Sequence, residues 1–177
     1  MKKVSAVLLV LMTAALPFAL QAQTDWIKYN SPEGRYSVLL PGEPKLSTQE
    51  AAASTGEKFT QYMAASEDSM AVYMVGYFDV APDKTFSFEK ARDGFIAAVK
   101  GTLLSEKVIS LAGYPGREAN VSANGGSGAE YLIQVRFYQV EKRIYVIQFI
   151  VAKSADAEVS AAKSAKYFDS FQVKTAR

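Results

Sequence analysis

Two neighbouring segments in the last third of the chain are the richest in hydrophobic positions. Residues 131–140 and 143–151 consist mainly of β-branched and aromatic residues, which favour strands. Only Glu141 and Lys142 lie between them, so the two segments are predicted to form a tight antiparallel hairpin. The apolar side chains of the second strand point to both faces, with Ile144, Val146 and Ile150 on one face and Tyr145, Ile147, Phe149 and Val151 on the other.

A strand that is apolar on both faces must be covered on both, so this hairpin is predicted to lie at the centre of a sheet. Leaving one face in water would cost roughly 1.5–3 kcal/mol for each large side chain exposed. Ile147→Asp is therefore expected to prevent folding. Lys142→Asp in the turn is expected to change stability by less than about 0.5 kcal/mol.

A helical period of apolar positions appears in two other segments. Apolar residues from Phe88 to Val99 recur at helical spacing and predict a helix over 85–100, and a second helix is predicted over 155–168. The candidate caps are Thr85 or Ser87 at the first N-terminus, Gly101 at the first C-terminus, and Ser154 or Asp156 at the second N-terminus.

Shorter strands complete the pattern. They are predicted at 26–29, 36–40, 58–64, 70–80, 108–111, 118–122 and 171–173. Residues 43–56 are small and polar without a clear period, and they are predicted to form an exposed connection. Adjacent strands are joined by turns too short for parallel crossovers, so the sheet is largely antiparallel. These elements predict an α+β fold, a three-layer α/β/α sandwich with a central sheet and a helix on each face.

The first residues have the order of a secretory signal peptide. A basic start at Lys2 and Lys3 precedes an uncharged apolar stretch, Pro17 ends it, and Ala22 offers a small residue for cleavage. The alternative is an uncleaved membrane anchor. We expect a signal peptide at 1–22, a single domain at 23–177, and a periplasmic or secreted protein without an integral membrane span after cleavage.

The composition excludes several functions. The chain of 177 residues contains no Cys and no His, which excludes disulfides, a lipid-anchored cysteine, a Ser-His-Asp triad and imidazole metal ligands. Without Lys2 and Lys3, its 20 basic residues fall to 18, which equals its 18 acidic residues, so the mature net charge is zero. No basic cluster indicates nucleic-acid binding, and no cofactor is expected.

Several short motifs, in this order and spacing, resemble the PsbP-like superfamily, and in particular its exported bacterial members. They are Ser31 to Gly42 (SPEGRYSVLLPG), Gly113 to Glu118 (GYPGRE), Arg143 to Tyr145 (RIY) and Tyr167 to Phe171 (YFDSF). The resemblance implies an antiparallel α/β/α sandwich without a shared catalytic site. The metal-binding positions of the photosystem members include histidines, which this chain lacks, so no metal site is implied here.

Three charged residues are candidates for a partner surface: Arg117, Glu118 and Arg143. The alternative is that these charges simply face solvent.

Possible carboxylate sites are Glu67 with Asp68 and Asp79 with Asp83, but neither stretch has the dense ligand loop that calcium prefers. Ser127 lacks both the second glycine of a nucleophile elbow and a His base.

An aromatic stripe offers either a ligand pocket or ordinary core. It consists of Tyr73, Tyr77, Tyr131, Phe137, Tyr145 and Phe149.

Taken together, these features of the sequence predict a non-enzymatic, exported binding or assembly module of the cell envelope with an unidentified protein partner. The alternatives are a carrier of a small apolar ligand and a hydrolase that uses two carboxylates.

Overall fold

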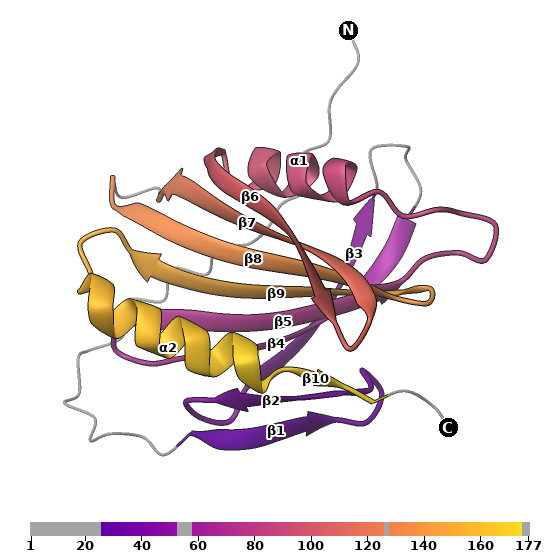
Figure 1. Cartoon of the computed structure of the whole chain (residues 1–177), viewed down its shortest axis with the longest axis horizontal. Helices are drawn as coiled ribbons and strands as arrows, with labels where there is room; N and C mark the ends of the chain where they lie inside the picture. The colour runs from indigo at the N-terminus through magenta and orange to yellow at the C-terminus, as the bar shows by residue number, and fades with distance from the viewer. Residues whose placement is uncertain (1–25, 53–57, 126–127, 175–177) are drawn as a thin grey trace, which may run out of the picture.

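The computed structural model describes residues 26–52, 58–125 and 128–174. They form ten strands and two helices (Figure 1). The strands are β1 (Ile27–Ser31), β2 (Tyr36–Leu40), β3 (Lys45–Ala52), β4 (Lys58–Glu67), β5 (Ala71–Asp79), β6 (Gly101–Leu111), β7 (Tyr114–Asn124), β8 (Glu130–Val140), β9 (Arg143–Ala152) and β10 (Gln172–Val173). The helices are α1 (Phe88–Ala98) and α2 (Ala157–Ser170).

The predicted hairpin of β8 and β9 lies in the middle of a seven-stranded sheet. The strand order is β3-β4-β5-β9-β8-β7-β6, and every pair of neighbours is antiparallel. The two-residue turn joins Val140 to Arg143 in register, and Glu141 has a positive φ of 57°. The fold is therefore α+β with a mostly antiparallel sheet, as expected.

The two faces of β9 pack against different elements. Ile147 and Phe149 belong to a cluster that includes Tyr167 of α2. Ile144, on the other face, belongs to a cluster against which Phe95 of α1 packs. Ile144 and Ile147 are both fully buried, which confirms that this strand is apolar and covered on both faces.

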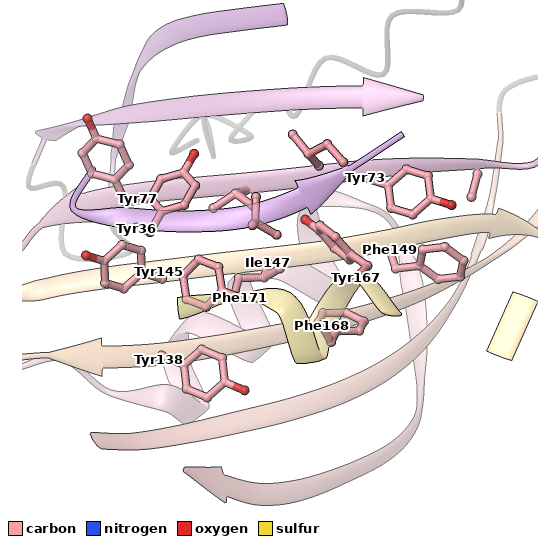
Figure 2. Close-up of a cluster of buried hydrophobic side chains, with 14 of the residues drawn as sticks. Tyr36, Tyr73, Tyr77, Tyr138, Tyr145, Ile147, Phe149, Tyr167, Phe168 and Phe171 are labelled. Carbon is pink, nitrogen blue, oxygen red and sulfur yellow. The ribbon is translucent and has the colours of Figure 1, made fainter. Parts of the chain in front are cut away.

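A smaller sheet lies beside α2, with β2 in the centre and β1 and β10 at its edges (Figure 1). Tyr36 of β2 is fully buried and contacts the rings of Tyr145 and Phe171, with centroids 6.1 and 5.6 Å apart (Figure 2). The ring of Tyr36 also packs closely on the backbone of Gly34. A Cβ at position 34 would lie 2.6 Å from this ring, so only glycine fits there. The small sheet, α2 and the large sheet thus share one core.

Both helices begin at predicted caps. The Ser87 hydroxyl accepts a hydrogen bond from the Lys90 backbone N–H at 3.2 Å, and the Asp156 carboxylate accepts one from Val159 at 2.9 Å. The prediction of Gly101 as a C-terminal cap was wrong. The helix ends at Ala98 with Val99 as its C-cap, and Gly101 is the first residue of β6, where a Cβ would lie 2.5 Å from Val121.

The exposed connection predicted at 43–56 was also wrong in part. Residues Lys45–Ala52 form the edge strand β3, which pairs with β4 from Lys45–Ala65 to Ala52–Lys58. Most side chains of β3 face solvent, so the strand has no apolar alternation for the sequence to reveal.

Residues 53–57 lie outside the described part of the chain, as do the predicted signal peptide 1–22 and Ser127. Neither described helix is long and apolar enough to cross a membrane.

Candidate functional site

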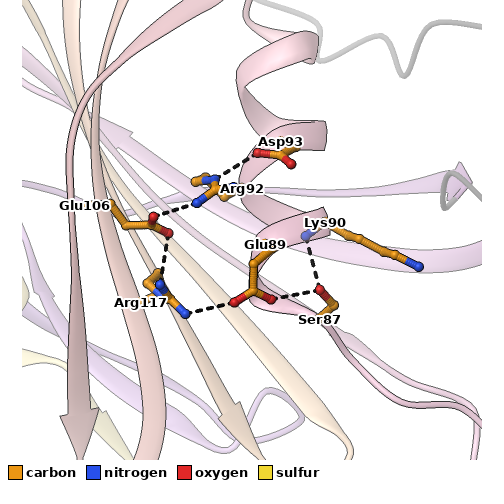
Figure 3. A network of polar contacts seen from close by, with 7 residues as sticks. All are labelled: Ser87, Glu89, Lys90, Arg92, Asp93, Glu106 and Arg117. Carbon is orange, nitrogen blue, oxygen red and sulfur yellow. Dashed lines mark hydrogen bonds and ion pairs between the residues drawn. The ribbon is translucent and has the colours of Figure 1, made fainter.

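Arg117 belongs to a polar network between α1 and the sheet (Figure 3). Its guanidinium lies 3.0 Å from a carboxylate oxygen of Glu89 and 3.4 Å from one of Glu106. Arg92 contacts Glu106 at 2.5 Å and Asp93 at 2.8 Å. The network therefore links α1 to β6 and β7.

Glu118 follows Arg117 in β7 and points to the opposite face of the sheet, where its carboxylate is 2% exposed. Lys107 of β6 lies 2.9 Å from one carboxylate oxygen, and Arg136 of β8 lies 2.6 Å from the other. Burial alone would raise the pKa of Glu118, but these two cations outweigh it and lower the pKa below its usual value. The Arg136 guanidinium also covers the ring of Phe168 at 4.3 Å.

Arg143 lies at the other end of the sheet, at the first residue of β9. It donates to both carboxylate oxygens of Asp79 at 2.7 Å and to the carbonyl of Glu33 at 2.6 Å. Its guanidinium also lies 4.7 Å from the ring centre of Tyr77. The hydrogen bond from Arg143 lowers the pKa of Asp79, although partial burial opposes this shift.

The structure thus places the three candidate residues in three separate clusters. Arg117 and Glu118 face opposite sides of β7, and Arg143 contacts β5 and the turn after β1. None of these charges simply faces solvent, because each pairs with a charge on another element. The sequence could not show these pairings, since they depend on the register between strands. A role for the three residues in partner binding remains a prediction.

Three of the four carboxylates considered as alternative sites, Asp68, Asp79 and Asp83, also pair with cations. Asp68 accepts hydrogen bonds from Lys163 at 2.7 Å and Tyr73 at 3.0 Å, and its other oxygen accepts from two backbone N–H groups. Burial would raise the pKa of Asp68, but Lys163 and the backbone donors lower it below the usual value. Asp79 pairs with Arg143, and Asp83 pairs with Lys84 at 3.1 Å. Across the described ranges, no three acidic side chains gather as a metal site would require.

The aromatic stripe divides between the two faces of the large sheet. Tyr73, Tyr77, Tyr145 and Phe149 form part of the cluster beside α2 (Figure 2). Phe137 packs on the other face, and Tyr131 is half-buried at one end of β8. Burial raises the pKa of Tyr73 and Tyr145, and the Tyr145 hydroxyl donates to the carbonyl of Gly34 at 2.8 Å. These rings pack against one another as core.

A further group of residues was not predicted from the sequence. Three aliphatic side chains of β6 are exposed: Leu103 by 37%, Leu104 by 56% and Val108 by 77%. Strand β6 forms one edge of the large sheet, beside α1 (Figure 1). In the sequence these residues belong to a mixed run of apolar and polar positions. Such a run does not show that the strand lies at the edge of the sheet.

No family model and no curated protein matches the chain. The solution structure of cyanobacterial PsbP from Synechocystis sp. PCC 6803 has a TM-score of 0.56 and 12% identity, over 90% of this chain and 98% of that one. The Ran-binding protein Mog1p of Saccharomyces cerevisiae has a TM-score of 0.49 and 13% identity, over 85% of this chain and 96% of that one. The likeness to PsbP confirms the expected resemblance to the PsbP-like fold, and at this identity it concerns the fold alone.

Proposed function

We propose that the chain is a non-catalytic, exported binding or assembly module of the cell envelope. The observation that carries the proposal is the group of exposed aliphatic residues on β6, of which Val108 is 77% exposed. Exposed apolar side chains that gather on one element are typical of surfaces that contact other polypeptides. The partner surface in this proposal is the β6 edge of the large sheet, with Arg117 at its border.

In this proposal the large sheet is the middle layer of an α/β/α sandwich. The two core clusters on opposite faces of β9 support it, because one includes Tyr167 of α2 and the other packs against Phe95 of α1. Covered on both faces, the sheet leaves its edges as the places where its backbone meets solvent. This arrangement directs a partner to an edge.

Two observations favour a polypeptide partner over the alternative functions. The pKa values of Asp68, Asp79 and Glu118 are lowered by neighbouring cations, whereas a general acid of a hydrolase needs a raised value. The aromatic rings that might have lined a ligand pocket pack against one another, with the centroids of Tyr73 and Tyr167 5.2 Å apart. The first observation supports a non-catalytic role, and the second argues against a carrier of a small apolar ligand.

Site-specific photo-crosslinking in intact cells tests this function. A photoreactive residue at Val108 should give a discrete adduct with a polypeptide. The matched control is Leu46, an apolar residue of similar exposure on the opposite edge strand β3. Equal labelling from both positions, or none from Val108, would show that the β6 edge is no binding surface.

Export is tested separately. We expect the mature protein to begin at Gln23, with residues 1–22 removed as a signal peptide, and to be recovered from the periplasm or the medium. Intact-mass analysis of the protein from each cell fraction would decide this. A protein that keeps residues 1–22 and stays with the membrane would contradict export in soluble form.

A further inference from the structure

Strand β6 offers a regular stretch of unpaired backbone. Its only neighbour among the described strands is β7, so no described strand forms hydrogen bonds with its other side. An irregularity interrupts the pairing between Leu103 and Ser105, and from Ser105 to Leu111 the register is continuous. Such an edge readily accepts another strand.

The regular part of the edge, from Ser105 to Leu111, contains no proline and no unpaired charge. Natural edges are often protected by such residues, by very short strands or by β-bulges, and the irregularity in β6 lies before this stretch. The only charged residues of β6, Glu106 and Lys107, both form ion pairs inside the chain, with Arg92 and Arg117 in one case and with Glu118 in the other. The most exposed large apolar side chain of the described residues, Val108, lies directly beside them.

We infer that two copies of the chain pair through β6, antiparallel, with Val108 at the two-fold axis. The inference rests on the proposed function and names a second copy as the first partner of that surface. In this register Val108 lies opposite its own copy, Lys107 opposite Ile109, Glu106 opposite Ser110, and Ser105 opposite Leu111. The pairing covers the whole regular part of the strand and joins the two large sheets into one.

Charge excludes two of the symmetric registers, and the high exposure of Val108 selects among the others. In an isologous pair, a two-fold axis through Glu106 or Lys107 would place that charge directly opposite its own copy, which destabilises strand pairing. The axis through Val108 puts no two like charges directly opposite, and it brings two exposed apolar side chains together. A contact through one strand edge buries a small area, so we expect a reversible dimer that depends on concentration.

The absence of cysteine from the natural chain allows a direct test of the register. Under mild oxidation, Val108→Cys should form a disulfide-linked dimer at least tenfold faster than Leu46→Cys, the matched control on the other edge. A mixture of Ser105→Cys and Leu111→Cys chains should give more crosslinked dimer than either variant alone. Equal rates at positions 108 and 46, or no gain in the mixture, would overturn the proposed pairing.

Sedimentation of the purified mature chain provides the second measurement. The parent should show a monomer–dimer equilibrium, and Val108→Lys should weaken association at least tenfold without lowering the melting temperature, while Leu46→Lys leaves both unchanged. A parent that stays monomeric at millimolar concentration would overturn the dimer. A photo-adduct from Val108 to a different protein would then still support the proposed function, so the two failures are distinguishable.

Discussion

The guanidinium of Arg143 holds three parts of the chain together: the start of β9, Asp79 of β5 and the turn that contains Glu33. We expect Arg143→Ala to lower the free energy of unfolding by about 2 kcal/mol, since charge-assisted hydrogen bonds contribute about 1.5–3 kcal/mol and Asp79 is partly exposed. Arg143→Lys should recover part of the loss, because it keeps the charge without the bidentate fork.

Urea denaturation followed by the fluorescence of the single tryptophan, Trp26, measures both variants. The control is Lys153→Ala, which removes an ion pair with Glu130 that is about half exposed on both sides. That change should cost less than about 0.5 kcal/mol. Equal effects of Arg143→Ala and Lys153→Ala would show that the contacts of Arg143 stabilise the fold no more than an exposed ion pair does.

Stability should depend on pH through Asp68 and Glu118. Both carboxylates have lowered pKa values in the folded chain, so their ion pairs stabilise it fully above the ordinary carboxylate pKa of about 4. As the pH falls from there through the lowered values, this contribution is lost. The free energy of unfolding should therefore decrease below about pH 4, and Asp68→Asn should make the decrease shallower.

Urea denaturation at a series of pH values between 2 and 7 checks this expectation. The matched control is Glu67→Gln, at the exposed end of β4 next to Asp68. An unchanged pH profile in the Asp68→Asn chain would mean that its ion pair with Lys163 does not form in solution.

At the scale of an element, replacing two glycines in and after α1 with alanine should change the stability of the fold in opposite directions. Gly94 lies inside the helix, where a Cβ would meet no atom within 4 Å, so Gly94→Ala should stabilise by about 0.5–1 kcal/mol. At Gly101 a Cβ would lie 2.5 Å from Val121 and 2.9 Å from the carbonyl of Ser122. Gly101→Ala should therefore destabilise by about 1–3 kcal/mol. Thermal unfolding of both variants measures the two signs, and a stabilising Gly101→Ala would contradict the close approach.

Elements with a strong pattern were predictable from the sequence, and those without one were not. The alternation of Ile144 and Ile147 between two buried faces placed β9 at the centre of the sheet. Strand β3 was missed because an exposed edge strand needs no apolar alternation. For the candidate site, Arg117 and Glu118 were noticed, but their partners come from β6, β8 and α1, and only strand register brings these together.

For the whole molecule, Ile147→Asp remains the most severe single change expected. Ile147 is fully buried in the cluster shared by the two sheets and α2, and an unpaired buried carboxylate there would cost several kcal/mol. The variant should fail to give a cooperative unfolding transition by circular dichroism. A variant that melts like the parent would show that β9 is not central.

The milder expectation for Lys142→Asp must be revised. The Lys142 ammonium donates to the carbonyls of Pro82 and Lys84, both at 2.9 Å, and so ties the β8–β9 turn to the segment before α1. We now expect a loss of about 1 kcal/mol instead of less than about 0.5 kcal/mol, because two hydrogen bonds to a charged donor disappear. Lys142→Arg, measured in the same urea titration, should retain most of the stability.

The small sheet joins segments that are far apart in the chain. Gln172 and Val173 of β10 pair with Ser37 and Tyr36 of β2, and Phe171 packs on the Tyr36 ring. On the ribosome, β2 is made long before β10. Tyr36 of β2 therefore lacks its contacts with residues 171–173 until that segment has been synthesised. Contacts of such long sequence separation also slow folding. The native core of this region can therefore close only after this segment has been synthesised.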